Sequence, residues 1–163
     1  MTINEKMLEQ IKLVHSSPDK WNGDSLLDHI DRIESTIKEY RIGSILDYGC
    51  GKAKHHPSHW RAVKYDPGVS EYSEKPTSNY DLVICTDVLE HIEEEYIDEV
   101  LAEIFQYANK FVYLCIGVHP AEEILPDGRN AHVLLKTCAW WRDKISQHKT
   151  VDHYVCWAWS ANR

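Results

Sequence analysis

The 163-residue sequence has no CxxC cysteine pair, no long apolar run and no excess of basic residues. Its five cysteines are odd in number and widely spaced, which argues against a disulfide framework and against a zinc knuckle. The longest apolar run covers only residues 111–118, whereas roughly 20 residues are needed to span a bilayer. Residues 1–14 are too charged for a signal peptide. We therefore expect a cytoplasmic protein with free thiols and no membrane segment.

The charge balance disfavours nucleic acid as a partner. Acidic residues outnumber basic ones by 26 to 18, giving a formal net charge of −8. Proteins that neutralise phosphates are usually basic, at least on one face. The ten histidines add little positive charge at neutral pH. A small-molecule or protein partner fits this balance better, and the sequence predicts no particular oligomeric state.

The length and composition predict one globular domain over residues 1–163. A chain of this size buries roughly 70 % of its unfolded surface without disulfides. No linker or internal repeat divides it. We expect N-terminal helices in residues 1–43, a binding core in residues 44–118, and a substrate-side loop with a C-terminal helix and strand in residues 119–163.

Apolar periodicity predicts four helices, at residues 3–14, 25–40, 93–108 and 138–147. The second is the clearest, because its apolar residues recur at steps of three and four. Ser25 and Asp28 resemble a capping box at its start. Thr137 is placed to cap the last helix.

Short apolar runs predict strands at residues 44–48, 63–65, 81–86 and 111–118, and a final strand or hairpin arm at 151–159. The run 111–118 is apolar throughout, which is typical of a strand buried on both faces. Such strands alternating with helices indicate a parallel sheet. The predicted fold class is α/β: an abbreviated Rossmann-like, mostly parallel sheet with helices on both faces.

Two features at predicted strand ends suggest a ligand site. Gly49 and Gly51 follow the first strand, where glycine lets the backbone approach a ligand closely. Asp66 follows the second strand, 19 positions after Asp47, and a carboxylate there can accept hydrogen bonds from ribose hydroxyls. Taken singly, each feature is also explained by an ordinary turn.

Three segments together carry a family resemblance. The segments LDYGCG, VKYDPG and YDLVICTDVLEHI, within residues 44 to about 118, are similar in order and spacing to the motifs of class I S-adenosylmethionine-dependent methyltransferases. The resemblance implies S-adenosylmethionine as cofactor, with Asp66 at its ribose. It places Thr86 and Asp87 beside the sulfonium, a cation that favours nearby oxygens. The methionine part would be surrounded by Asp47, Gly49 and Gly51, and Cys50, between the two glycines, is also expected to bind the cofactor.

The sequence also departs from the family pattern. Ala53 stands at the third glycine position, and Pro57 follows in a stretch with poor helix propensity. These residues predict a short first crossover. A nicotinamide site is disfavoured because Lys54 occupies the last position of a Gly-x-Gly-x-x-Gly pattern. A non-catalytic module that binds S-adenosylmethionine or S-adenosylhomocysteine is the alternative to a methyltransferase.

Methyl transfer needs a general base only if the acceptor atom is protonated, and the candidates are His91 and His132. The substrate-side candidates are Glu90, Asp127, Arg129 and Asn130. Glu90 is equally explained by the dipole at a helix start, and the loop around Arg129 by an exposed turn. Residues 1–24 and 119–132 are candidate lids. No metal site is predicted, because no partner completes a set with the three histidines His55, His56 and His59.

Overall fold

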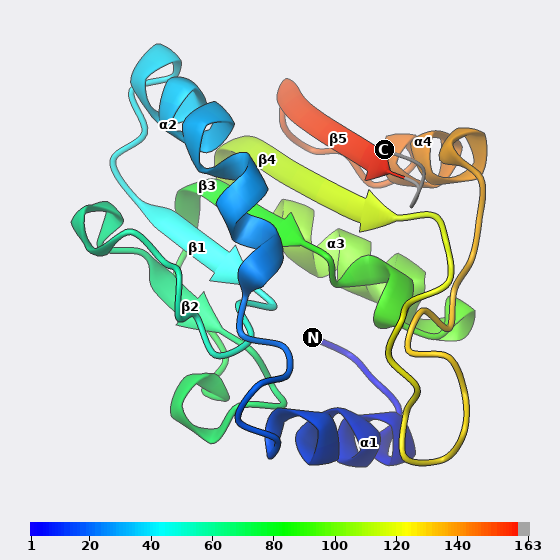
Figure 1. The fold of residues 1–163 in the computed structure, drawn as a ribbon. Helices are drawn as coiled ribbons and strands as arrows, with labels where there is room; N and C mark the ends of the chain where they lie inside the picture. The colour runs from blue at the N-terminus through cyan, green and yellow to red at the C-terminus, as the bar shows by residue number, and fades with distance from the viewer. Residues whose placement is uncertain (160–163) are drawn as a thin grey trace.

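A computed structural model describes residues 1–159 of the chain. Its strands form a single five-stranded sheet, and every pair of neighbours is parallel. The strand order is β2-β1-β3-β4-β5 (Figure 1). The bounds are β1 Ile45–Tyr48, β2 Val63–Tyr65, β3 Tyr80–Thr86, β4 Ala108–Gly117 and β5 His153–Trp159. The α/β, Rossmann-like prediction is confirmed, and the parallel pairing of β5 with β4 rules out a hairpin arm.

Helices cover both faces of this sheet. Helix α2 (Ile30–Glu39) packs on one face, and α3 (Ile97–Tyr107) and α4 (Cys138–Ser146) pack on the other (Figure 1). Helix α1 (Glu5–His15) instead lies across the carboxyl ends of the strands. Among the described residues, no helix combines the length and the apolar character needed to cross a bilayer.

The core follows from the alternation of side chains along each strand. In β1, Ile45 packs with the α2 side and Leu46 with the α3 side, and both are buried. Strand β4 is buried on both faces from Phe111 to Gly117, as its unbroken apolar sequence predicts. The sheet is thus a central layer whose two faces are both closed by helices.

The start of the second predicted helix differs from expectation. Residues Asp24–His29 form a 3-10 helix, and the α-helix begins only at Ile30. Within residues 1–159 no side chain caps either start, so the predicted capping box of Ser25 and Asp28 is wrong. The predicted cap at Thr137 is confirmed, because its hydroxyl accepts a hydrogen bond from the Trp140 amide at 3.2 Å.

The first crossover is short, as predicted. Between β1 and β2 the only helical segment is one 3-10 turn, Ser58–Trp60, which follows Pro57. Between β2 and β3 there is likewise a single 3-10 turn, Ser70–Tyr72. Because neither connection adds a helix over the carboxyl ends, the space beside β1 and β2 is filled by the N-terminal segment instead.

Candidate functional site

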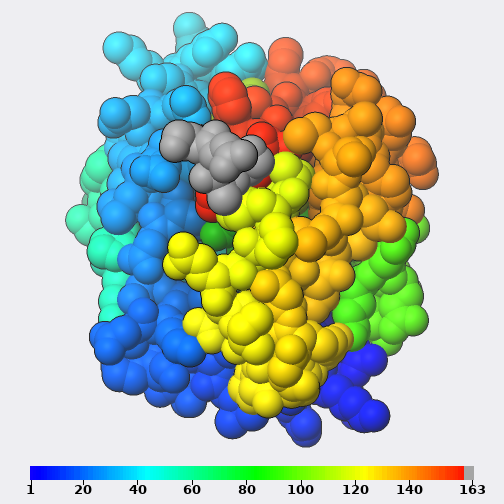
Figure 2. Space-filling model, turned by 45° about the vertical axis from the view of Figure 1, so that its right-hand side comes forward, coloured from blue at the N-terminus to red at the C-terminus, as the bar shows by residue number. Residues whose placement is uncertain are grey.

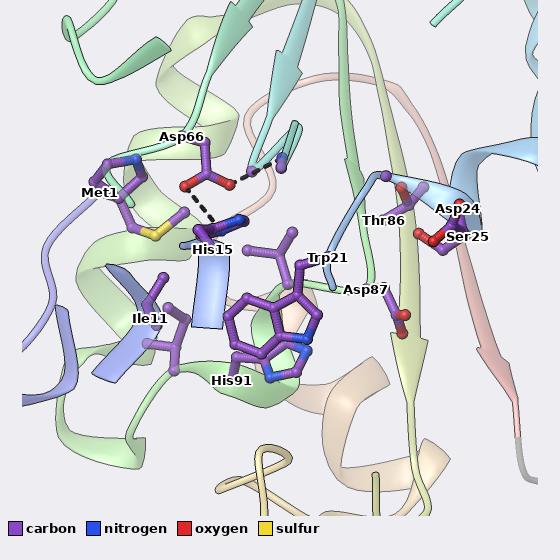
Figure 3. Close-up of a pocket in the computed structure, with 16 residues that line it drawn as sticks. Met1, Ile11, His15, Trp21, Asp24, Ser25, Asp66, Thr86, Asp87 and His91 are labelled. Carbon is purple, nitrogen blue, oxygen red and sulfur yellow. Dashed lines mark hydrogen bonds and ion pairs between the residues drawn. The ribbon is translucent and has the colours of Figure 1, made fainter. Parts of the chain in front are cut away.

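A pocket of about 170 Å³ lies at the carboxyl ends of β1, β2 and β3 (Figure 3). Strand order reverses there, because β1 lies between β2 and β3. In open α/β sheets this reversal is the usual place for a ligand. The residues predicted from sequence that line the pocket are Gly49, Gly51, Asp66, Thr86, Asp87 and His91.

Asp66 joins the glycine turn to the end of β2. Its Oδ2 accepts a hydrogen bond from the Gly51 amide at 2.9 Å, and its Oδ1 accepts one from the Gly68 amide at 2.8 Å. His15 Nε2 lies 3.7 Å from Oδ1 (Figure 3). A carboxylate has about four acceptor sites. Asp66 is therefore held in place by the backbone and still has acceptor capacity toward the pocket.

The glycine turn has the backbone conformation that its glycines predict. Gly49 and Gly51 have φ values of 81° and 55°. A Cβ on Gly49 would lie 2.4 Å from a methyl of Val88, and one on Gly51 would lie 2.8 Å from the Trp21 carbonyl oxygen. Ala53, at the third glycine position, also has a positive φ, 50°, which costs roughly 1–2 kcal/mol for a residue with a Cβ. The close approach at this turn is thus made by Val88 at Gly49 and by the N-terminal segment at Gly51.

Residues 16–24 lie over this turn and bind it through backbone hydrogen bonds. The Lys52 amide donates to the Trp21 carbonyl at 3.3 Å, and the Lys54 amide donates to the Asn22 carbonyl at 3.0 Å. The Trp21 ring contacts the rings of His15 and His91, with centroids 5.2 Å and 4.9 Å apart. Figure 3 shows Trp21 and His91 side by side in the pocket wall. This places one of the two predicted lid segments over the candidate site.

Asp87 follows β3 in a strained position. Its φ is 60°, in the left-handed region that aspartate tolerates better than most residues. Its amide donates to the Cys115 carbonyl at 3.0 Å, which ties the turn to β4. One carboxylate oxygen, Oδ1, is buried without a hydrogen-bond partner among the described residues. The Asp87 side chain thus lines the pocket while this oxygen is turned into the interior.

His91 is the candidate base that reaches the pocket. Its Nδ1 donates to the Ala131 carbonyl at 2.8 Å, so Nε2 keeps a lone pair. Burial and the neighbouring His132 lower the pKa of His91 to about 4. The ring is therefore neutral at physiological pH and can accept a proton only transiently.

Glu90 and His132 lie just beyond the pocket wall. Glu90 is fully buried and accepts a hydrogen bond from the Gly117 amide. Its burial, with the nearby Asp87 charge, raises its pKa well above the usual range. His132 is 7 % exposed, and its Nδ1 donates to the His119 carbonyl at 2.5 Å. Asp87, Glu90 and His132 each present one possible ligand atom, all within 4.8 Å of one another.

The helix-start interpretation of Glu90 is wrong. Residues Leu89–His91 form a separate 3-10 turn, a second such turn covers Glu94–Tyr96, and α3 begins only at Ile97. A carboxylate seven residues before the first residue of the helix does not interact with its dipole, which acts within the first turn. Glu90 is instead an interior group.

Two predicted cofactor residues lie outside the pocket lining. Asp47 shares the α2 face of β1 with Ile45, where His56 Nε2 lies 3.4 Å from its Oδ2. Burial and the charge of Asp66 raise the pKa of Asp47 to about 7. Cys50 is buried and its thiol donates to the Gly51 carbonyl at 3.3 Å. The structure does not bring either side chain to the ligand position that the resemblance implies.

Three predicted substrate-side residues belong to a loop that packs on α1. Arg129 binds Asp127 at 2.8 Å and Glu93 at 3.0 Å. The Asn130 side chain bonds to the backbone of Ala121. Figure 2 shows this yellow-to-orange segment between the blue N-terminal region and α4. Their polar groups stabilise the loop, and none of the three lines the pocket.

The three histidines of the first crossover are directed to three different carboxylates. His55 lies 2.7 Å from Asp24, and His59 lies 2.7 Å from Glu34. His56 faces Asp47. They therefore do not converge on one point. Several pocket residues were missed by sequence reasoning, foremost His15 and Trp21, since neither belongs to a recognisable motif.

A scan against family models and a search of curated proteins found no match to this chain. What the site offers chemically is a largely apolar pocket at the strand-order reversal, with three carboxylates and two imidazoles in its lining: Asp24, Asp66, Asp87, His15 and His91.

Proposed function

We propose that this chain is a methyltransferase that binds S-adenosylmethionine in this pocket and transfers its methyl group to a small-molecule or protein acceptor. The observation that carries the proposal is the position of Asp66. Its carboxylate ends β2, fixes the glycine turn through the Gly51 amide, and faces a pocket at the strand-order reversal. A carboxylate there is suited to ribose hydroxyls.

The acidic groups of the pocket suit a nucleoside ligand that has hydroxyl groups and a positive charge of its own. Asp66 supplies acceptors for hydroxyls, and the carboxylate of Asp87, which lines the pocket, supplies negative charge for a sulfonium. The cavity of about 170 Å³ is smaller than the roughly 300–1,000 Å³ of typical ligand pockets. Binding therefore requires residues of the N-terminal segment, foremost His15 and Trp21, to move outward.

Bound S-adenosylmethionine would supply an already activated methyl group, so the chain's own part is alignment and exclusion of water. Asp66 would orient the nucleoside and Trp21 would cover it. His91 Nε2, which keeps its lone pair, would accept the proton of a hydroxyl or amine acceptor.

The first test is calorimetric titration with S-adenosylmethionine and S-adenosylhomocysteine. We expect saturable binding that Asp66→Asn weakens at least tenfold, because the amide offers one acceptor oxygen in place of two and carries no charge. Glu71→Gln, an exposed carboxylate five residues away, is the matched control and should bind normally. If the folded protein gives no heat of binding with either ligand, the proposal is wrong.

The second test separates an enzyme from a non-catalytic binding module. Transfer of a labelled methyl group to any acceptor shows catalysis, and His91→Asn should then slow transfer by about 100-fold or more. Because His91 also lines the pocket, its effect on the affinity for S-adenosylmethionine should be much smaller than its effect on the rate. Binding without methyl transfer would favour the non-catalytic binding module. That alternative is consistent with a pocket that the N-terminal segment covers. Equal transfer rates in wild type and His91→Asn would exclude His91 as the base.

A further inference from the structure

We propose that Asp87, Glu90 and His132 bind one first-row divalent metal cation at the inner edge of the pocket. The proposal goes beyond methyl transfer and does not depend on it, because the three side chains define the site without any nucleoside. They come from three parts of the chain: the end of β3, the 3-10 turn Leu89–His91, and the loop before α4.

The three ligand atoms are close enough to share one ion. All lie within 4.8 Å of one another. Ligands bound at about 2.0–2.2 Å from one metal are roughly 3–4.4 Å apart, depending on the angle. Because 4.8 Å is an upper bound on each separation, the largest contraction needed to reach bonding distance lies between about 0.4 and 1.8 Å, depending on the angle at the metal.

When Glu90 and Asp87 are both ionised, the groups that meet here are all acceptors, whereas a protonated Glu90 can donate to Asp87. Glu90 Oε2 and Asp87 Oδ1 are buried and have no hydrogen-bond partner among residues 1–159. Glu90 is 0 % exposed. The third group, His132, uses Nδ1 as donor to the His119 carbonyl, so Nε2 carries the lone pair. Two carboxylates and an imidazole lone pair placed together need a proton or a metal cation between them, and the three ligand types suit a metal.

The surroundings hold these side chains in place. The His119 carbonyl fixes the tautomer and ring orientation of His132, as partners outside the coordination shell do for metal-binding histidines. The Gly117 amide holds the other oxygen of Glu90. A Cβ on Gly117 would lie 2.7 Å from both Glu90 Oε1 and His132 Cε1. Glycine at this position therefore makes room for both side chains.

The ligand set indicates the class of metal. Carboxylate oxygens suit Mg²⁺ and Mn²⁺, and an imidazole nitrogen shifts the preference toward Mn²⁺, Fe²⁺ or Zn²⁺. Three protein ligands leave at least one coordination position open. Asp87 also lines the pocket, so an oxygen of a molecule bound there would lie next to the ion.

The test is metal titration of chelator-treated, folded protein without any nucleoside. We expect one Mn²⁺ or Zn²⁺ per chain, bound more tightly than Mg²⁺, together with a raised melting temperature. Glu90→Gln and His132→Gln should each weaken binding at least tenfold. Asp87→Asn should do the same, and it is the safest variant for folding because asparagine also tolerates a positive φ. Circular dichroism checks that each variant is folded.

Glu34→Gln is the matched control, since Glu34 is an exposed carboxylate 2.7 Å from a histidine and should leave the affinity unchanged. Absence of saturable uptake in the wild type would show that protons alone hold the three groups together, and would overturn the proposal. Uptake that none of the three variants weakens would overturn it as well. Either result leaves the S-adenosylmethionine titration unaffected, so the two proposals fail independently.

Discussion

Replacing Trp141 by alanine should lower the free energy of unfolding by about 3–5 kcal/mol, the usual range for a fully buried tryptophan. Trp141 lies on α4, is 0 % exposed, and packs in the larger core on the α3 side of the sheet. The loss combines the apolar area returned to water with the cavity left behind, because a close-packed interior relaxes only in part. Urea denaturation followed by circular dichroism measures the change.

Two further variants show whether packing accounts for the loss. The Trp141 indole Nε1 has no hydrogen-bond partner among the described residues. Trp141→Phe keeps most of the ring volume and removes that buried donor, so its loss should stay below about 2 kcal/mol. Trp140, half-buried and edge-on to Trp141 at 5.0 Å, is the matched control, with an expected loss below about 1.5 kcal/mol. Equal losses in Trp140→Ala and Trp141→Ala would contradict this account of the core.

Replacing Asp47 by asparagine should stabilise the protein by about 2–4 kcal/mol at pH 8. Asp47 is 4 % exposed, and burial with the nearby Asp66 charge raises its pKa from 3.8 to about 7. His56 offers no counter-charge, because its own burial lowers its pKa. The asparagine amide can instead donate to His56 Nε2, which lies 3.4 Å from Oδ2 and has no partner in the described part of the chain.

The pH dependence has a definite sign. A carboxyl group with a raised pKa in the folded state favours folding when it is protonated, so the native state binds more protons than the unfolded state. Its contribution is fully present below pH 3.8 and is lost as the pH rises through about 7. The stability difference between Asp47→Asn and wild type should therefore be near zero at pH 4 and largest at pH 8.

Denaturation of both proteins at several pH values measures this difference. Asp24→Asn is the control, because Asp24 also lies 2.7 Å from a histidine but its side chain is 61 % exposed. Its effect should stay within about 0.5 kcal/mol at every pH. A stability difference for Asp47→Asn that does not change between pH 4 and pH 8 would show that Asp47 is ionised normally in the folded state.

The sheet was predictable from sequence because its determinants are local. The unbroken apolar sequence of β4 predicts burial on both faces, and the glycine turn after β1 predicts the positive φ values found at Gly49 and Gly51. Thr137 could be predicted to cap α4 because the capping hydrogen bond, from the Trp140 amide to its hydroxyl, spans only three residues. Pro57 predicts the absence of a helix in the first crossover for the same local reason.

The candidate site was only partly predictable, because contacts between distant segments decide it. His15 and Asp66 are 51 positions apart, and no local pattern indicates that the end of α1 meets the end of β2. Asp47 is directed away from the pocket because side chains alternate along β1, although its position in the motif suggested otherwise. Glu90 acquires its surroundings from Gly117 and the loop before α4, both far along the chain.

The all-parallel sheet also has a consequence for how the chain folds. Parallel neighbours cannot be joined by a two-residue hairpin, so each pairing must wait until a crossover has closed. β1 pairs with β3 only after the chain has made and left β2. Because this loop entropy is lost before non-local contacts form, such topologies fold slowly for their size. Until β3 and β5 flank it, the apolar segment of β4 is exposed to association with other chains.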